Sequence, residues 1–328
     1  MSDFNSITHF IQSNDKFILT AHETPDGDAI GSESAMRITL ERLGKEVLVI
    51  NADPTPEKYK YLYGSDLITI LKDESQIPEN VHEYVLLILD TNDIHNIGQI
   101  ADLLLPKVKN YFIVDHHESD DDIIMDNHIE ESASSTCEIL YHLCMLMNIP
   151  LELPLATALF TGIMYDTGSF IYPKTSALTF KIAHHLVESG VKPNYIYRRI
   201  YESNSISALK LQSRVLSTLE LFYNQNVAAQ TMTRDMIAEC NARYEEADTL
   251  INIPLKSEKV MVSLFFKENE DGILRCSLRS KDDINVAEIA QLYGGGGHKT
   301  AAGFKSIWPL ETIKQKVLDM LAKYFPDT

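Results

Sequence analysis

Four short runs rich in Val, Ile and Leu in the first 120 residues constrain the fold of this chain more than any other feature. The runs span residues 17–22, 46–50, 84–89 and 111–114. Because none of them alternates apolar and polar residues, we expect strands that are buried on both faces, as in a parallel sheet covered by helices. Residues 28–43 place apolar side chains at helical spacing between the first two runs, and Gly44 ends this helix. The pattern predicts an α/β domain built on a parallel sheet.

The middle of the chain has a helical pattern. Residues 134–202 predict consecutive helices, which begin at the N-cap cluster Ser134–Thr136. The most apolar stretch, residues 139–165, is broken by prolines and polar side chains, so two buried helices fit it better than one membrane span. Residues 205–223 predict a further helix, which we interpret as the connector between two domains.

A different pattern follows, and it predicts a smaller α+β domain. Strands are expected at residues 227–231, 260–266 and 273–278, and helices at residues 286–293 and 310–324. Asn269–Gly272 separates the second and third of these strands with a turn sequence that predicts a hairpin. We therefore divide the chain into a first domain at residues 1–190, a helical connector at 191–223 and a second domain at 224–328.

The net charge of the chain limits the kinds of partner that it can bind. Its 328 residues hold 29 Lys and Arg against 47 Asp and Glu, a net charge of −18. Residues 1–190 hold 11 basic and 30 acidic residues, whereas residues 191–328 are nearly neutral. Such a chain is a poor binder of long nucleic acid and of anionic membranes, because both are held by many Lys and Arg side chains. The four cysteines form no Cys-x-x-Cys pair and the first residues resemble no signal segment, so we expect reduced core thiols and a cytoplasmic location.

Acidic and His residues follow three of the predicted strands. They are the segment His22–Asp28, which contains Asp26, then Asp90, and then Asp115–His117. Because open parallel sheets bind ligands at the carboxyl ends of their strands, we expect these side chains to lie together. Each also has an ordinary structural explanation, since Asp26 or Asp28 can cap the next helix and Asp90 can be a cap or a surface residue.

Asp166 adds a carboxylate inside an apolar helical segment, where an unpaired charge would be costly; a buried, hydrogen-bonded Asp is the alternative. With the strand ends it gives two histidines and four carboxylates, which are Asp26, Asp28, Asp90 and Asp166. Oxygen and nitrogen donors without a thiolate suit Mn²⁺ or Mg²⁺ better than a structural zinc ion. Four carboxylates match the charge of two divalent ions, and two such ions about 3.5–4 Å apart activate water and clamp a phosphoryl group.

A run of glycines marks the second domain. Gly294–Gly297 is followed by His298 and Lys299, and glycines allow positive φ angles and a close approach of the backbone. Their successive N–H groups could form an anion-binding nest, to which His298 and Lys299 add donors. A flexible linker is the alternative, but a linker seldom stands between a helix and a strand of a compact domain. Arg279, at the end of the predicted hairpin, is either a surface residue or a residue whose guanidinium binds a phosphate with two hydrogen bonds.

Taken in order, these motifs closely resemble the DHH/DHHA1 phosphoesterase family over nearly the whole chain. Four motifs resemble those of the catalytic DHH domain, namely His22-x-x-x-Asp26-x-Asp28, Asp90, Asp115-His116-His117 and Asp166. The Arg279 segment and Gly294–His298 resemble the substrate-binding DHHA1 domain. Each motif alone is weak evidence, whereas all of them in order are specific. The resemblance implies a parallel-sheet DHH domain joined through the helical connector to a smaller α+β DHHA1 domain.

The resemblance also implies roles for these residues. His22 and Asp26 would bind one Mn²⁺, Asp28, His116 and Asp166 would bind the other, and Asp90 would bridge both. Asp115 would orient His116 from outside the ligand set, while His117 would face the substrate phosphate. The part of the substrate that does not react would be held by Arg279, Gly294, Gly295, Gly296, Gly297 and His298.

Length and composition favour one type within the family. The exonuclease RecJ has an additional nucleic-acid-binding domain, and membrane-bound cyclic dinucleotide phosphodiesterases have transmembrane and sensor domains, for which we see no room in this chain. Pyrophosphatases of the DHH type lack the glycine-rich His motif. The chain is therefore similar to the compact nanoRNase/pAp phosphatase and pApA phosphodiesterase types.

The expected function is hydrolysis of very short nucleotides to nucleoside monophosphates by two-metal activation of water. Expected substrates are RNA of a few residues, linear dinucleotides such as pApA, and pAp, and the expected cofactors are two Mn²⁺ ions, with Mg²⁺ as the other option. We expect no long nucleic acid and no membrane as partners, whereas the resemblance allows a homodimer. Two alternatives stay open: a RecJ-like exonuclease on short single-stranded DNA, and a nucleotide-binding regulator without turnover. A metal-dependent scaffold is a third class, which the Gly294–His298 loop does not support.

Overall fold

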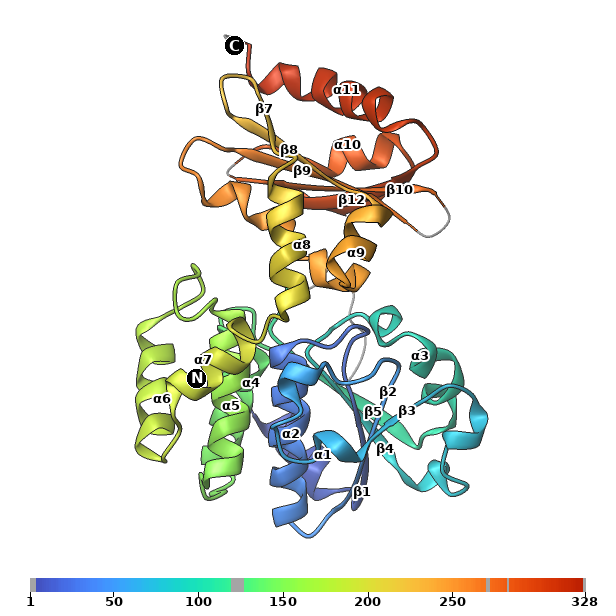
Figure 1. Ribbon diagram of the computed structural model, residues 1–328. Coiled ribbons are helices and arrows are strands. Elements are labelled where there is room, and N and C mark those ends of the chain that lie inside the picture. The colour runs from blue at the N-terminus through green and yellow to red at the C-terminus, as the bar shows by residue number, and fades with distance from the viewer. Residues whose placement is uncertain (1–3, 119–126, 270–271, 282, 327–328) are drawn as a thin grey trace. The chain divides into compact units, whose positions relative to one another are not determined.

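The computed structural model describes residues 4–118, 127–269, 272–281 and 283–326. It divides the chain into two compact units, residues 1–203 and residues 204–328, and each unit is described by itself (Figure 1). Two predictions concern residues outside these ranges. The predicted absence of a signal segment involves residues 1–3, and the predicted hairpin turn includes residues 270 and 271.

The first unit is built on a six-stranded sheet in which every neighbouring pair of strands is parallel. In the spatial order β3-β2-β1-β4-β5-β6, its strands are β3 (Ile68–Ile70), β2 (Glu46–Asn51), β1 (Lys16–Thr20), β4 (Val85–Leu89), β5 (Asn110–Asp115) and β6 (Asn127–Ile129). Every residue of β4 is buried, as expected for a strand covered on both faces. The predicted parallel α/β domain is confirmed. Strands β3 and β6 were not predicted, because a three-residue strand is too short to be recognised as an apolar run.

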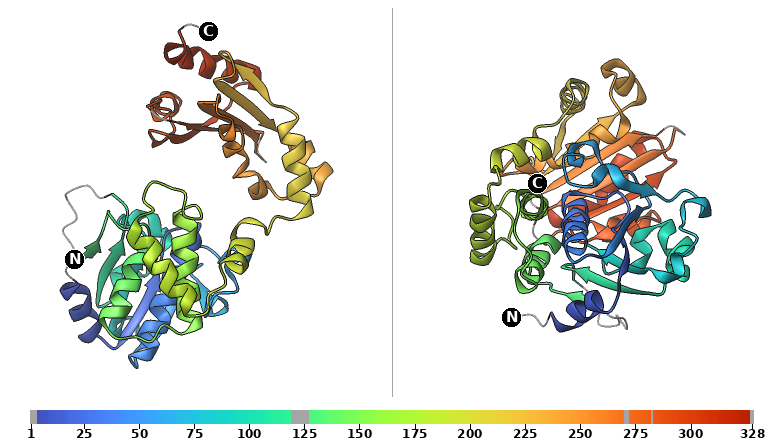
Figure 2. Two further views of the ribbon diagram at one scale, coloured as in Figure 1. Left: turned by 90° about the vertical axis from the view of Figure 1, so that its left-hand side faces the viewer. Right: turned by 90° about the horizontal axis from the view of Figure 1, so that it is seen from below.

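Helices cover both faces of this sheet (Figures 1 and 2). The helices of this unit are α1 (Asn5–Gln12), α2 (Gly27–Arg42), α3 (Gln99–Leu103), α4 (Thr136–Leu146), α5 (Leu153–Asp166), α6 (Ala177–Glu188) and α7 (Pro193–Tyr201), of which α6 and α7 pack on α5. Phe17 and Leu19 of β1 join the core formed with α2, α4 and α5, whereas Ile18 joins the core formed with α3. The apolar stretch at 139–165 forms α4 and α5, as predicted. Among the described residues, no helix is both long enough and apolar enough to span a membrane.

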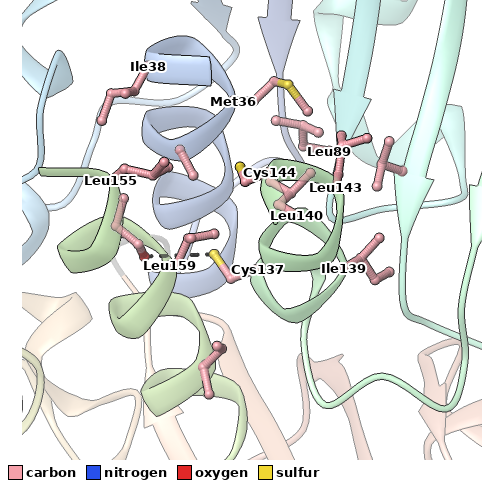
Figure 3. Close-up of a cluster of buried hydrophobic side chains, with 14 of the residues drawn as sticks. Met36, Ile38, Leu89, Cys137, Ile139, Leu140, Leu143, Cys144, Leu155 and Leu159 are labelled. Atoms are coloured by element: carbon pink, nitrogen blue, oxygen red, sulfur yellow. Dashed lines mark hydrogen bonds between the residues drawn. The ribbon is translucent and has the colours of Figure 1, made fainter. Parts of the chain in front are cut away.

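Small residues let α2 and α5 approach each other closely. A Cβ atom on Gly31 of α2 would lie 2.8 Å from the backbone oxygen of Ala158, and a Cβ on Gly162 of α5 would overlap Asp28 and Cys137. Side chains of α2, α4 and α5 meet in the core beside this contact (Figure 3), and all four cysteines of the chain are free and buried. Because such cores are close-packed, the first turn of α2, which carries Asp28, is held against α4 and α5.

Besides Asp28, α2 contains a second buried acidic side chain, Glu33. The residue is 1% exposed, and its Oε2 accepts a hydrogen bond from Asn51 Nδ2 at 3.1 Å. Its Oε1 has no hydrogen-bond partner among the residues that the structure describes. Burial, partly offset by the Asn51 hydrogen bond, raises the pKa of Glu33 to about 8. The folded chain therefore keeps a proton on Glu33 at pH values where the unfolded chain has lost it.

We expect Glu33→Gln to stabilise the protein increasingly as the pH rises from 5 to 8. Below the usual pKa of 4.5 the carboxyl is neutral in both states, but between pH 4.5 and about 8 only the unfolded chain ionises, which favours unfolding. Since one pKa unit corresponds to about 1.4 kcal/mol, the advantage of the Gln variant in unfolding free energy should grow by at least about 2 kcal/mol over this range. Urea unfolding of both proteins at the two pH values measures it. Parallel pH profiles would mean that Glu33 is ionised in the folded protein.

The second unit contains a mixed six-stranded sheet. In the order β11-β12-β10-β9-β8-β7, its strands are β11 (Gly296–His298), β12 (Ala301–Ser306), β10 (Leu274–Ser280), β9 (Val262–Glu268), β8 (Val227–Met232) and β7 (Glu220–Phe222). Only β8 and β9 pair in parallel. Its helices are α8 (Ile206–Leu216), α9 (Arg234–Cys240), α10 (Ala287–Leu292) and α11 (Leu310–Leu321). In Figure 1, α10 and α11 cover one face of this sheet and α8 and α9 the other. The predicted smaller α+β domain is confirmed.

The helix predicted at residues 205–223 ends earlier than expected. α8 ends at Leu216, and residues 220–222 form β7, which pairs with β8 in antiparallel fashion. Leu219 and Leu221 fall within the predicted helix, but residues two apart also lie on one face of a strand. The predicted hairpin is present, because β9 and β10 pair in antiparallel fashion.

Candidate functional site

All six predicted ligand residues lie together at the carboxyl ends of the parallel strands. They come from the loop after β1, the first turn of α2, the residues that follow β4 and β5, and the last residue of α5. Their ligand atoms form two groups, and within each group the atoms lie within 4.8 Å of one another. The first group is His22, Asp26 and Asp90, and the second is Asp28, His116 and Asp166.

The loop between β1 and α2 positions His22 and Asp26. Asp26 is the N-cap of α2, because its Oδ1 accepts hydrogen bonds from the backbone N–H groups of Asp28 at 2.9 Å and Ala29 at 3.2 Å. Its Oδ2 lies 3.9 Å from His22 Nε2. His22 Nδ1 lies 2.7 Å from the backbone oxygen of Glu23, and since a carbonyl oxygen only accepts, Nδ1 carries the hydrogen and Nε2 keeps its lone pair. Capping the helix thus leaves one oxygen of Asp26 available to a ligand group.

The second group surrounds the buried ring of His116. Its Nε2 lies 2.8 Å from Asp166 Oδ2 and 3.9 Å from Asp28 Oδ2, but it has no hydrogen bond of acceptable geometry within the described part of the chain. Its Nδ1 lies 3.4 Å from the backbone oxygen of Ala133, which again is an acceptor and places the hydrogen on Nδ1. Buried polar atoms are normally hydrogen-bonded. An imidazole nitrogen that faces carboxylates without such a bond suits a metal ligand.

Asp90 joins the two groups. Its Oδ2 lies 3.8 Å from His22 Nε2, and its Oδ1 lies 3.7 Å from His116 Nε2. The residue is 2% exposed, and Thr136 Oγ1 donates a hydrogen bond to Oδ1 at 2.9 Å. Asp90 has a φ of +63°, a left-handed conformation that Asp tolerates better than most residues. Backbone strain of this kind is concentrated at functional sites, which argues against the interpretation of Asp90 as an ordinary cap.

The N-terminus of α4 holds Asp28 in place. The backbone N–H groups of Thr136 and Cys137 donate to Oδ2 and Oδ1 of Asp28 at 2.6 and 3.0 Å, a favourable arrangement because helix N-termini attract anions. The predicted N-cap cluster lies at this position, and Ser135 is the N-cap. The contact with Asp28 was not predicted, since the partner stands 108 residues earlier in the chain.

The carboxylates in these groups disfavour each other's charge. Burial and the charge of Asp166 raise the pKa of Asp28 to about 6, against the opposing effect of His116. Burial and the charges of Asp28 and Asp26 raise the pKa of Asp90 well above its usual range. Divalent cations would reverse these shifts, because they stabilise the ionised carboxylates. The site therefore suits divalent cations such as Mn²⁺ or Mg²⁺. It offers oxygen and nitrogen donors, the buried Nε2 of His116, and carboxylates that lie close together.

Asp115 contacts His117 and not His116. Its Oδ1 lies 2.7 Å from His117 Nδ1, whereas we had expected it to orient His116. Residues two apart in an extended chain point to the same side, which brings Asp115 and His117 together and turns His116 toward the ligand groups. The Oδ2 atom of Asp115 is buried with no hydrogen-bond partner among the described residues, and Asp115, Asp90, His116 and His117 have ligand atoms within 4.8 Å of one another.

An open cavity of about 680 Å³ in the second unit contains most of the predicted substrate residues. Arg279, Gly294, Gly295 and Gly296 line it, whereas Gly297 and His298 lie on the adjoining β11 and are not part of its lining. Arg275 and Lys305, which pair across β10 and β12, also line the cavity. Neither of these two residues was predicted. The available signal was the two-residue period of a strand, because Arg275 and Arg279 lie four apart on β10 and so share a face.

The glycine run closes a helix and approaches a strand. Gly294 and Gly297 have φ angles of +73° and +134°, and a Cβ atom on Gly295 would overlap the backbone of β12, so the predicted positive φ and close approach are confirmed. The predicted anion-binding nest is wrong for the first two glycines. Their N–H groups donate to the backbone oxygens of Gln291 and Ala290 at 3.0 and 2.9 Å, and these bonds complete the C-terminus of α10.

Comparison with known families gives a match in each unit. The model described as the DHH family, N-terminal domain, matches residues 16–163, a range that contains five of the six predicted ligand residues and ends just before Asp166. The DHHA1 domain model matches residues 224–325, a range that contains every residue lining the cavity.

Related proteins share nearly the whole length of the chain. It is 28% identical over 324 residues to the probable bifunctional oligoribonuclease and PAP phosphatase of Streptococcus mutans, with 98% of this chain and 100% of that protein covered. It is 27% identical over 286 residues to the bifunctional oligoribonuclease and PAP phosphatase of Thermus thermophilus, with 87% and 82% covered. The crystal structure of an exopolyphosphatase-related protein from Bacteroides fragilis is similar with a TM-score of 0.91 and 26% identity, covering 100% of this chain and 99% of that one. The chain therefore contains a DHH N-terminal domain followed by a DHHA1 domain.

Proposed function

We propose that this chain is a metal-dependent phosphodiesterase that hydrolyses short oligoribonucleotides, linear dinucleotides such as pApA, and pAp. The observation that carries the proposal is the pair of ligand groups joined by Asp90. It stands in a chain whose relatives, over most of their length, are named as oligoribonucleases and PAP phosphatases. Each cleavage would consume one water molecule and release AMP from pApA, or AMP and phosphate from pAp.

Two divalent cations fit the proposed site, with Mn²⁺ as the first choice and Mg²⁺ as the second. His22 and Asp26 would hold one, Asp28, His116 and Asp166 would hold the other, and Asp90 would be shared. When bound, the cations would supply a Lewis acid for the scissile phosphate and lower the pKa of a water molecule. Asp26 is fixed as a helix cap and Asp28 by the N-terminus of α4, so both carboxylates are held in place before a ligand arrives.

His117 is the proposed group that faces the substrate. Its Nδ1 is fixed by Asp115 at 2.7 Å, and its side chain is 54% exposed. Asp115 would therefore orient the ring, as carboxylates outside a ligand set commonly do, and leave Nε2 to hydrogen-bond a phosphate oxygen or to pass a proton to the leaving oxygen.

The second unit is proposed to bind the part of the substrate that does not react. Arg275, Arg279 and Lys305 bring three positive charges to the glycine-lined cavity, which suits a phosphate group. Tyr293 and Phe304 line the same cavity, and their rings stack with centroids 4.7 Å apart. Such rings offer a surface on which a nucleobase can stack without sequence preference.

The deciding experiment is a substrate panel for the full chain with Mn²⁺ or Mg²⁺. The panel contains pApA, a five-residue RNA, pAp, inorganic polyphosphate and a long single-stranded DNA. We expect rapid hydrolysis of the short nucleotides, slow or no hydrolysis of the long DNA and of polyphosphate, and complete loss of activity with a chelator that added Mn²⁺ reverses.

Other outcomes of the panel would contradict the proposal in distinct ways. Preference for the long DNA would favour an exonuclease, and preference for polyphosphate would favour a polyphosphatase. Binding of pAp without hydrolysis of any substrate would favour a nucleotide-binding regulator. Activity that resists the chelator would rule out the proposed role of the two ligand groups.

Arg279→Ala is expected to raise KM for pApA about tenfold and to change kcat by less than about twofold. The reason is that a residue that binds the non-reacting part stabilises the bound substrate and the transition state equally. Steady-state kinetics measure both constants, with Lys259→Ala, an exposed cation in the same unit, as the control. A fall in kcat with an unchanged KM would place Arg279 at the reacting phosphate instead.

A further inference from the structure

Two lysines of the first unit lie beside the ligand groups and form no ion pair with the described acidic residues. Residues 1–190 contain 11 Lys and Arg side chains. Ion pairs with Asp or Glu are made by Lys16, Arg37, Arg42, Lys45, Lys60 and Lys107. The other five, which are Lys58, Lys72, Lys109, Lys174 and Lys181, form no ion pair within the described part of the chain, although this unit is rich in acids. Of these five, Lys58 and Lys174 are the two that the contacts below place beside a ligand group.

Lys58 is held near Asp26 by aromatic rings. It lies in the short turn Glu57–Tyr59, and its Nζ is 4.9 Å from the ring centroid of Tyr59 and 5.6 Å from that of Tyr165, within the range of a cation–π contact. The Tyr165 side chain packs on Gly27, where a Cβ atom would lie 2.6 Å from that of Tyr165. Lys58 is thus fixed over a ring that touches the backbone between Asp26 and Asp28. Burial lowers the pKa of Lys58, and the Asp26 carboxylate acts against this change.

Lys174 is held at the second ligand group. Its Nζ donates a hydrogen bond to the backbone oxygen of His116 at 3.0 Å. An ammonium group has three donors, so this bond anchors the side chain beside His116 and leaves two donors for another acceptor. Because the bond is made to a carbonyl, the positive charge of Lys174 is not neutralised by it.

We propose that Lys58 and Lys174 bind the non-bridging oxygens of a phosphoryl group at the two ligand groups, one lysine beside each group. The assignment rests on the proposed function, because it takes a phosphate ester as the ligand of this site. It extends that function by placing phosphate-binding cations in the acidic first unit itself, in addition to those of the second unit.

Charge balance gives the physical reason for two such lysines. Two divalent cations would balance the four carboxylates Asp26, Asp28, Asp90 and Asp166 and leave no excess positive charge for the substrate. A phosphodiester adds one negative charge, and a terminal phosphate adds up to about two. Two ammonium groups without carboxylate partners match this charge, and lysine is a common phosphate binder.

The test compares Lys58→Met and Lys174→Met with Lys60→Met and Lys181→Met. Methionine keeps most of the apolar stem, so packing on the rings is retained. Lys60 is an exposed residue that pairs with Glu57 at 2.6 Å, and Lys181 is exposed on α6; both serve as controls. Affinity for AMP, the probe for a phosphate monoester, is measured by calorimetry on the Mn²⁺-loaded protein, and kcat/KM is measured for pApA.

We expect each of the first two variants to weaken AMP binding and to lower kcat/KM about 10- to 100-fold, as for the loss of a hydrogen bond to a charged group. Mn²⁺ affinity and Tm should stay unchanged, the controls should stay within about twofold of wild type, and Lys58→Arg should restore most of the loss. Unchanged AMP affinity, or an equal loss of Mn²⁺ affinity, would overturn the assignment, as would a wild-type protein that binds no AMP. If the wild type hydrolyses no short nucleotide yet binds AMP through these lysines, the proposed function fails and the assignment stands.

Discussion

Asp90→Asn is expected to lower kcat/KM for pApA by at least about 10³-fold, because it removes the one carboxylate that both proposed metal positions share. The two oxygens of Asp90 face His22 and His116 separately, at 3.8 and 3.7 Å, so a single substitution affects both groups. Mn²⁺ binding should fall with activity, which calorimetry of the same preparations measures.

Asn is the right replacement because it keeps the local structure. It tolerates the φ of +63° at this position as well as Asp does, and its side-chain oxygen can still accept the hydrogen bond from Thr136. Asp102→Asn, which changes an exposed carboxylate on α3, is the matched control and should stay within about twofold of wild type. A loss below tenfold for Asp90→Asn would mean that Asp90 has a structural role only.

Gly162→Ala is expected to destabilise the fold and the site together. The added methyl group would overlap both Asp28 and Cys137, and overpacking of a core costs about 1–3 kcal/mol, which exceeds the roughly 1 kcal/mol that Ala gains over Gly in a helix. Asp28 would also shift away from the N–H groups of Thr136 and Cys137. Since a displacement of about 1 Å can cost about 10²-fold in rate, we expect a fall in kcat/KM of that order.

Two measurements separate the parts of this effect. Urea unfolding with a chelator present reports the packing cost alone, and it should remain when no metal can bind. Kinetics at saturating Mn²⁺ report the displacement of Asp28, and kcat/KM should stay low even under conditions in which all of the protein is folded. A variant with wild-type stability and activity would show that α2 and α5 separate easily, contrary to the close packing of the core.

The parts of the fold that depend on neighbours along the chain could be predicted from the sequence. The apolar runs at 84–89 and 111–114 predicted β4 and β5, and the parallel arrangement placed Asp90 and His116 at one edge. That edge is where the structure brings the six candidate ligands together. Burial on both faces is a strong constraint on composition, so strands of this kind are recognisable without any knowledge of their partners.

Contacts between distant segments could not be predicted in this way. The hydrogen bonds from Thr136 and Cys137 to Asp28 join segments whose sequences carry no sign of each other. The pairing of Asp115 with His117 depends on the direction of the chain beyond β5, which ends at Asp115; the two-residue spacing is compatible with this pairing but does not fix it. Lys58 lies over the ring of its neighbour Tyr59, but its second ring contact is with Tyr165, far along the chain, which local sequence does not indicate.

The order of the ligand residues along the chain has a consequence for biosynthesis. His22 and Asp26 are made early, but Asp166 is the last residue of α5 and the last of the six to be synthesised. A nascent chain therefore cannot complete the second ligand group until α5 has emerged from the ribosome and packed on α2. An ion that needs every residue of the second group could therefore not stabilise the growing sheet before that point, whereas the first group, which ends with Asp90, is complete earlier.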